Sequence, residues 1–247
     1  MSPDLLAALV LGVFLIALLY SSVGHAGASG YIAVMALFSV APDVIKPTAL
    51  MLNLLVASIA SWQFWRAGHF SWALFWPFAL LAVPLAFLGG WLHLPAPGLK
   101  FALGLVLLFS AANFLLRPTA DAAQPPARPV ALASGAGIGL LAGMTGTGGG
   151  IFLTPLLIHL RWAPVKAAAA VSALFILVNS AAGLAGTVGA AHGRDGPALA
   201  LPLAMAVVAG GAIGSYYGSR RFPHASIKRF LAAVLTIAGS KLVLTAT

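Results

Sequence analysis

The sequence predicts an all-α integral membrane protein that contains two repeats of a glycine-broken helix. Apolar residues make up 61% of its 247 residues and charged residues only 7%, so a water-soluble domain would lack a polar surface. Two glycine-rich segments, 24–30 and 143–150, each lie between two apolar runs. A proline-rich segment at 117–129 separates the two series of runs and is typical of a linker.

The apolar runs are the expected membrane helices. Two of them, 31–41 and 151–160, follow the glycine-rich segments and are about half as long as the roughly 20 residues that a helix needs to cross a bilayer. We therefore predict half-helices at these two places and longer helices elsewhere. In chain order the runs cover 5–20, 31–41, 48–65, 71–92, 99–116, 130–142, 151–160, 167–190, 198–218 and 227–246.

The second half of the chain repeats the first. A shift of 120 residues places Lys46 on Lys166, and a shift of 119 places the glycines at 24, 27 and 30 on those at 143, 146 and 149. At a shift of 128, small residues at 82, 86 and 90 meet glycines at 210, 214 and 218, a spacing that lets membrane helices pack closely. We expect one domain over 1–247, with repeat 1 at about 1–117, a linker at 118–129 and repeat 2 at about 130–247. Each repeat is expected to be a glycine-broken helical hairpin followed by three transmembrane helices.

The distribution of cations predicts that the two repeats have inverted topology. Cytoplasmic loops of membrane proteins carry an excess of Lys and Arg. Inverted repeats put nine cations on the cytoplasmic side and four outside, whereas parallel repeats give a weaker asymmetry of eight to five. The inverted arrangement leaves Lys46, Lys100, Arg194 and Lys241 outside, and its cytoplasmic cations are Arg66, Arg117, Arg128, Arg161, Lys166, Arg220, Arg221, Lys228 and Arg229.

Composition also limits the function. The net charge is +9, but the cations are scattered among loops instead of forming a basic stripe, so we expect no nucleic-acid partner. The chain has no cysteine, which excludes disulfides and thiolate metal ligands, and the spacing of its histidines predicts no metal site. The runs contain no carboxylate pair or Ser-His-Asp set, so we expect neither an enzyme nor a cofactor. The N-terminal run has no cationic region before it and is expected to be retained.

Three segments carry a resemblance to a known family. Gly143-Met-Thr-Gly-Thr-Gly-Gly-Gly-Ile-Phe-Leu-Thr-Pro155 is followed by Val171-Ser-Ala-Leu-Phe175 and Asn179-Ser-Ala-Ala-Gly183. With the doubled arrangement and the chain length, these segments resemble the sulfite exporter TauE/SafE family, also called toluene sulfonate uptake permeases, over nearly the whole chain. The first copy, Gly24-His-Ala-Gly-Ala-Ser-Gly30, has fewer glycines and departs more from the pattern. The resemblance implies transport, with export as the favoured direction, of sulfite, sulfonates or related organic anions across a bacterial inner membrane.

The two breaks form the expected anion site. Helix N-termini present free N–H groups and about half a positive charge, so half-helices that begin near residues 30 and 150 can hold an anion without a buried arginine. Glycines let the anion approach the backbone, and hydroxyl and amide side chains add donors. Of the two amides, we expect Asn179 to contribute more than Asn53. The candidate binding residues are Ser22, Gly24, His25, Gly27, Ser29, Gly30, Asn53, Thr145, Gly146, Thr147, Gly148, Gly149, Gly150 and Asn179.

The sequence leaves the transport mechanism open. His25 is the ionisable group inside the breaks and is the candidate proton carrier, whereas passive export of the anion down the membrane potential needs no proton. The same helix dipoles would serve an anion channel as well as a carrier. We expect a secondary transporter of a small anion in the lipid bilayer, multi-pass and located in the inner membrane, with an anion channel as the alternative. A homodimer is compatible with the sequence.

Overall fold

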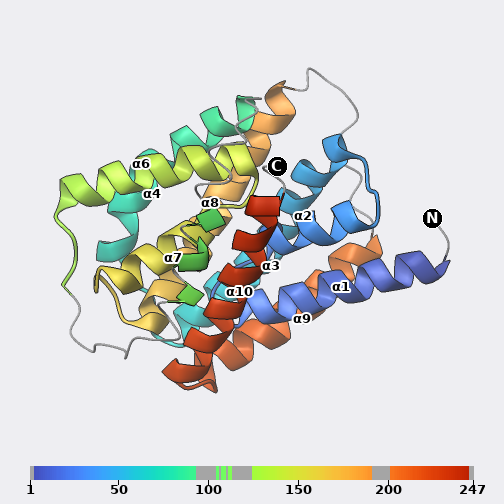
Figure 1. Cartoon of the computed structure of the whole chain (residues 1–247). Helices are drawn as coiled ribbons and strands as arrows, with labels where there is room; N and C mark the ends of the chain where they lie inside the picture. Colours follow the sequence, from blue (N-terminus) through green and yellow to red (C-terminus); the bar gives the residue numbers. More distant parts are fainter. Residues whose placement is uncertain are drawn as a thin grey trace.

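A computed structural model describes the chain as a bundle of helices (Figure 1). It covers residues 3–92, 104–105, 107–109, 111–112, 124–190 and 201–244, without the side chains of residues 42, 43, 190, 224 and 242. Within these ranges the secondary structure is helical and contains no strand, which confirms the predicted all-α class. Half of the predicted linker, residues 118–123, lies outside the described residues together with Lys100, Arg117 and Arg194.

The described helices follow the predicted runs closely. The run at 99–116 is described in part, and its residues Leu107 and Ala111 pack against α10. The helices are α1 (Pro3–Ser21), α2 (Ala28–Leu37), α3 (Pro42–Arg66), α4 (Trp72–Trp91), α6 (Arg128–Thr145), α7 (Gly150–His159), α8 (Val165–Ala190), α9 (Leu201–Arg220) and α10 (His224–Leu244).

Helix length separates spanning helices from half-helices. Helices α2 and α7 have 10 residues each, which corresponds to about 15 Å, or roughly half of the hydrocarbon thickness. This confirms the predicted half-helices. Five of the described helices are long and apolar enough to cross a membrane, at Pro3–Ser21, Val44–Arg66, Trp72–Trp91, Val165–Gly189 and Leu201–Arg220.

Helix α3 is longer than predicted at its N-terminal end. The apolar run begins at residue 48, whereas the helix begins at Pro42. Proline is tolerated in a first helical turn because the N–H group it lacks would have no partner there. The polar stretch that includes Lys46 is therefore helical, which places this cation on α3 and not in a loop.

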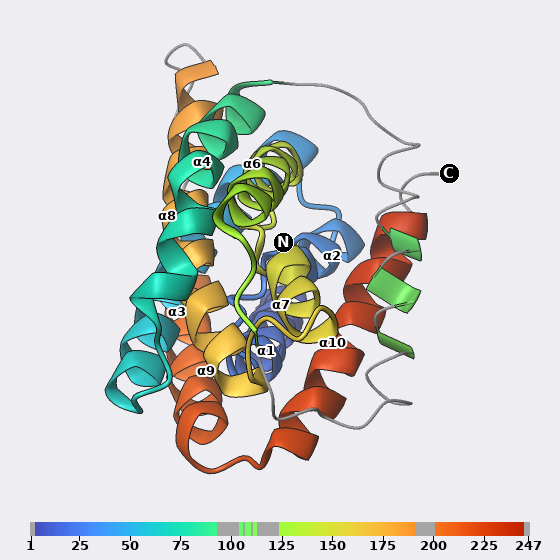
Figure 2. The ribbon, with the colours of Figure 1, turned by 90° about the vertical axis from the view of Figure 1, so that its left-hand side faces the viewer.

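The two sequence halves are interlocked. Helix α1 packs along α9, and α4 packs along α6. Helices α1 and α6 are the first described helices of their halves, and α4 and α9 are the fourth. The first helix of each half therefore lies against the fourth helix of the other half. Figures 1 and 2 show both pairs side by side. One hydrophobic core combines residues of α1, α2, α3 and α9 with Ile176 of α8, and another combines residues of α4, α6, α7 and α8. Each core thus consists mainly of three helices of one half and one helix of the other half, which is α9 in the first core and α4 in the second.

Small residues make these exchanged contacts close. A Cβ atom on Gly214 of α9 would clash with the backbone of Leu18 in α1, and a Cβ atom on Gly139 of α6 would clash with the backbone of Ala82 in α4. The predicted rows at 82, 86, 90 and at 210, 214, 218 are therefore packing surfaces. In lipid the hydrophobic effect does not drive helices together, so van der Waals contact between closely packed backbones stabilises their association.

The register between the two breaks differs from the predicted one. The glycines with a left-handed backbone conformation match between the two breaks at a shift of 122 residues. Gly24 (φ 78°) then corresponds to Gly146 (φ 73°), and Gly27 (φ 108°) corresponds to Gly149 (φ 83°). The starts of α2 and α7, at 28 and 150, have the same shift. The predicted shift of 119 is wrong by three residues. It matched glycines by identity, whereas positive φ decides which glycines are equivalent.

The close contact between α4 and α6 leads to a stability prediction. Gly139→Ala should lower the free energy of unfolding by about 1–3 kcal/mol, since the added methyl group meets the backbone of Ala82 and the packed helices must separate. Gly137 lies on the same helix with open space around it, so Gly137→Ala should be neutral or stabilise the helix by up to about 1 kcal/mol. Thermal unfolding in detergent measures both variants, and equal melting temperatures would contradict the packing role of Gly139.

Candidate functional site

The first break connects α1 to α2 through residues 22–27. Its backbone turns where the N–H groups of Val23 and His25 both donate to the carbonyl oxygen of Tyr20, at 3.2 and 2.9 Å. The hydroxyl of Tyr31, one turn into α2, donates back to the carbonyl oxygen of Ala26 at 2.5 Å. Side chains of α2 thus satisfy part of the backbone that the break exposes.

The second break connects α6 to α7 through residues 146–149. Gly146 ends α6 and Gly149 precedes α7, both with left-handed backbone, and Gly148 has φ 76° as well. Three residues with positive φ in four positions require glycine in practice. The Thr145 hydroxyl donates to the carbonyl oxygen of Leu141 at 2.7 Å and lies 2.9 Å from the Thr147 hydroxyl.

Asn53 of α3 links the two breaks. Its side-chain oxygen accepts a hydrogen bond from the backbone N–H of Ala28, the first residue of α2, at 2.9 Å. Its side-chain nitrogen donates to the Ser180 hydroxyl of α8 at 3.2 Å and lies 3.5 Å from the carbonyl oxygen of Thr147 in the second break. Asn53 is fully buried, so this amide stabilises the arrangement in which both breaks lie together.

Four backbone N–H groups at the starts of the half-helices make no hydrogen bond within the described part of the chain. Asn53 accepts a hydrogen bond from the N–H of Ala28, and Gly149 accepts from two residues of the first turn of α7. The four unbonded groups belong to Ser29, Gly30, Gly150 and Ile151. Such groups inside a membrane protein are costly unless a ligand or water binds them.

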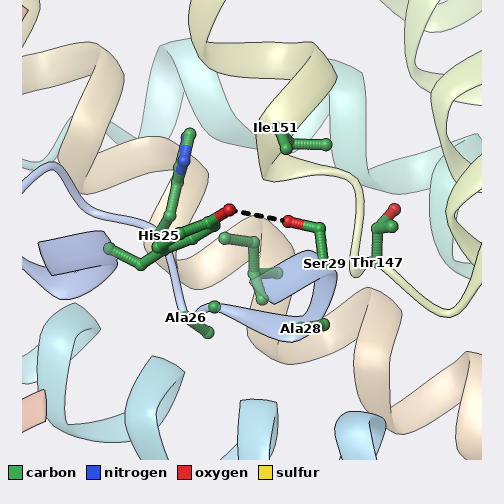
Figure 3. Close-up of a pocket in the computed structure, with 9 residues that line it drawn as sticks. His25, Ala26, Ala28, Ser29, Thr147 and Ile151 are labelled. Atoms are coloured by element: carbon green, nitrogen blue, oxygen red, sulfur yellow. Dashed lines mark hydrogen bonds between the residues drawn. The ribbon is translucent and has the colours of Figure 1, made fainter. Parts of the chain in front are cut away.

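The start of each half-helix faces one small cavity. Figure 3 shows Ala26 of the first break with Ala28 and Ser29 of α2 on one side and Ile151 of α7 on the other. The cavity has about 10 Å³ of space for the centre of a water molecule, which is near the minimum for holding one water. The described lining contains no Lys, Arg or Asp and consists of Tyr20, His25, Ala26, Gly27, Ala28, Ser29, Thr147, Ile151 and Ile176.

Polar side chains around this cavity form two short chains of hydrogen bonds. The Ser29 hydroxyl donates to the Tyr20 hydroxyl oxygen at 3.1 Å, drawn as a dashed line in Figure 3. The Nε2 atom of His25 lies 2.8 Å from the Thr154 hydroxyl oxygen, and Thr154 donates to the Ser172 hydroxyl at 2.7 Å. With Nε2 protonated, His25 would donate to Thr154 and its Nδ1 would be an acceptor, which has no partner among the described residues.

The structure brings some of the predicted site residues together. Four of them line the cavity: His25, Gly27, Ser29 and Thr147. Others lie one contact away: Gly148 packs on Asn53 and Ser180, and Gly149 packs on Phe175. Gly24, Gly30, Gly146 and Gly150 shape the breaks without lining the cavity.

Three predicted side chains bond to backbone within a few residues of their own positions. The Ser22 hydroxyl donates to the carbonyl oxygen of Leu19 at 2.7 Å, and the Thr145 hydroxyl donates within α6. The Asn179 amide donates to the carbonyl oxygen of Phe175 in its own helix at 2.8 Å. Asn53 and not Asn179 contacts both breaks, whereas the larger contribution of Asn179 to anion binding stays a prediction. Asn53 lies where α3 passes the start of α2. At the same place α8 approaches the second break through Ser180.

Sequence reasoning missed Tyr20, Thr154 and Ser172 as site residues. A signal existed for two of them, because Tyr20 directly precedes the first break and Thr154 is a polar residue within a short apolar run. The hydrogen bond between His25 and Thr154 joins residues 129 positions apart, which no local pattern reveals. The described side chains contain no group of three His or Asp residues that could hold a metal ion.

Comparison with known proteins identifies the family. Residues 9–242 match the family described as Sulfite exporter TauE/SafE. The chain belongs to this family. It is also 42% identical over 241 residues to a protein of Sinorhizobium fredii (strain NBRC 101917 / NGR234) named "Probable membrane transporter protein y4hK", with 95% of this chain and 96% of that protein covered. No solved structure matches the chain.

Membership of the TauE/SafE family settles the class of function. The chain is a transport protein and not an enzyme, and its apolar helices make it a multi-pass membrane protein. The resemblance inferred from the glycine segments is confirmed over nearly the whole chain.

The position of Asn53 leads to a prediction that distinguishes the two amides. Asn53→Ala removes the acceptor of the Ala28 N–H group and the donor to Ser180, so it should lower the free energy of unfolding by about 1–3 kcal/mol. Asn179→Ala loses one bond within its own helix and should have a smaller effect. Thermal unfolding in detergent makes the comparison, with Ser58→Ala as a control on the exposed face of α3, where the hydroxyl bonds to Leu54. A larger loss for Asn179→Ala would contradict this assignment.

Proposed function

We propose that this TauE/SafE protein is a secondary transporter that exports a small sulfur-containing or organic anion, such as sulfite or a sulfonate, across a bacterial inner membrane. The observation that carries the proposal is the meeting of two half-helix N-termini at one cavity, whose lining includes Ser29 and Ile151 with their unbonded N–H groups. The name of the related Sinorhizobium protein supports transport, and the description of the family supports sulfite.

The chemistry of the cavity suits an oxyanion. A sulfite or sulfonate group carries three oxygen acceptors, which match the N–H groups at the starts of α2 and α7 and the hydroxyls of Ser29 and Thr147. The two helix N-termini supply partial positive charge. A carboxylate near the breaks would oppose binding, and the described lining contains none.

The size of the cavity favours a carrier over a channel. An anion of four heavy atoms needs several times the space that one water molecule needs, so the two breaks must move apart before it binds. A channel would need a continuous wide path. We propose that the two interlocked halves are inverted repeats and that one moves against the other to expose the site to each side in turn.

Counterflow in proteoliposomes tests this function. Vesicles loaded with unlabelled sulfite, sulfoacetate, taurine or thiosulfate should accumulate the labelled anion transiently, because a carrier exchanges its substrate whereas a channel only dissipates the gradient. Gly148→Val and Gly149→Val should abolish exchange, since both positions have positive φ and their added side chains would meet Asn53 and Phe175. Gly189→Val is the matched control, because Gly189 lies on α8 with open space around it.

Two outcomes would contradict the proposal. Exchange at the wild-type rate by a correctly inserted Gly149→Val protein would show that the second break does not form the anion site. A sustained anion leak without counterflow would show that the protein is an anion channel and not a carrier.

Energy coupling leads to a separate prediction. An inside-negative potential favours expulsion of an anion by about 2.3 kcal/mol per charge per 100 mV, so we expect export to need no proton. Anion flux at a clamped potential should then be insensitive to an imposed pH gradient. Uphill accumulation that follows the pH gradient in the wild type and disappears in His25→Gln would show instead that His25 carries a coupled proton.

A further inference from the structure

Lys46 lies against the second break. A Cβ atom on Gly146, the residue that ends α6, would come within 2.8 Å of the Cγ atom of Lys46. The next residue along the chain is Thr147, which lines the cavity. The lysine stem therefore contacts the same short loop that forms one wall of the candidate site.

Lys46 also shares a helix face with the amide that joins the breaks. It precedes Asn53 by seven residues, two turns of α3, so the two side chains project to the same side of the helix. Seven residues at 1.5 Å each correspond to about 10 Å. Lys46 is half-buried, whereas Asn53 is fully buried. The backbone of Lys46 thus lies about 10 Å from that of Asn53, toward the N-terminal end of α3.

No described cation packs on Gly24 of the first break in the way that Lys46 packs on Gly146. Gly24 is the structural equivalent of Gly146, and its contact is the backbone of Ala169 in α8. Lys166, which corresponds to Lys46 in the sequence repeat, instead donates to the carbonyl oxygen of Ser219 at 3.4 Å. The two breaks therefore differ in charge although they are similar in backbone.

We propose that Lys46 is the entry cation of the anion site on the side of the membrane that the N-terminal end of α3 faces, an inference that rests on the proposed function. A fixed positive charge beside an otherwise uncharged path raises the local concentration of anions. It acts before the anion reaches the N–H groups of the half-helices. No described carboxylate pairs with it; the side chain of Asp43, one turn earlier, is outside the described set.

A structural role would give Lys46 a different signature. It lies near the C-terminal end of α6, where a cation stabilises the helix dipole, and such a contact would affect stability without affecting anion affinity. Transport kinetics and thermal stability must therefore be measured on the same variants.

The experiment compares wild type, Lys46→Met and Lys46→Cys in counterflow, with sulfite as the probe or whichever of sulfoacetate, taurine and thiosulfate exchanges best. The methionine keeps the stem and removes the charge. The KM for the anion should rise about tenfold with little change in maximal rate, the effect of one charge at about 10 Å in a medium of effective dielectric constant about 20. High salt should shrink the difference, because the screening length falls to about 3 Å at 1 M.

Chemical rescue makes the test independent of folding. The chain contains no cysteine, so Lys46→Cys carries a single thiol. A membrane-impermeant methanethiosulfonate reagent with a positive charge should restore the low KM, and its negatively charged analogue should raise the KM further. Each reagent should act from one side of the vesicle and should be slowed by substrate.

The matched control is Lys166→Met, which should leave the KM unchanged because Lys166 bonds to a backbone carbonyl away from the second break. A wild-type KM in Lys46→Met, or equal effects of both reagents on Lys46→Cys, would overturn the entry role while wild-type counterflow leaves the proposed function intact. Absence of counterflow in the wild type would overturn the proposed function, and the entry role with it.

Discussion

The constraint on which the structure depends is the cost of free backbone polar groups inside a membrane. Breaking two helices near their middle exposes N–H and C=O groups that water cannot reach. The Asn53 amide and the Tyr31 hydroxyl satisfy groups at the first break, and the Thr145 hydroxyl bonds to the helix before the second. Of the unbonded N–H groups at the starts of α2 and α7, those of Ser29 and Ile151 belong to residues that line the cavity. Incomplete satisfaction at that place is the basis of the proposed anion site.

The breaks meet because the two halves of the chain exchange helices. Helix α1 lies on α9 of the other half and α4 lies on α6, each through glycines whose Cβ atoms would strike a neighbouring backbone. These contacts leave the half-helices α2 and α7 near the centre, in separate cores that are joined by α3 and α8. Asn53 and Ser180 form the polar contact between those two helices. Packing by small residues therefore positions the chemistry without a hydrophobic driving force between helices.

Local features of the sequence predicted the helices, the half-helices and the two breaks, because apolar length and glycine content act within a few residues. The cavity-lining residues His25, Gly27, Ser29 and Thr147 were predicted for the same reason. The hydrogen bonds of Asn53 were not predicted, since its partners lie 25 to 127 residues away. The repeat register failed at the glycines because a shared residue type does not imply a shared backbone conformation. Contacts such as His25 with Thr154 depend on tertiary packing and leave no mark in the sequence.

The two glycine breaks have similar backbone conformations but different side chains around them. Helices α3 and α8 begin at residues 42 and 165, a shift of 123. At this shift Asn53 of α3 corresponds to Ile176 of α8. Asn53 bonds to Ala28 at the start of α2 and to Thr147 in the second break, whereas Ile176 lines the cavity. A strictly symmetric pair would hold the anion equally from both sides and with two amides. The cavity has instead no described cation in its lining, so helix dipoles and hydroxyls would hold the anion in the proposed site. A helix N-terminus carries about half a positive charge, less than the full charge of an ammonium group, and a transporter must release what it binds. A central site without a full positive charge therefore fits the proposed exchange of the anion across a membrane better than its storage.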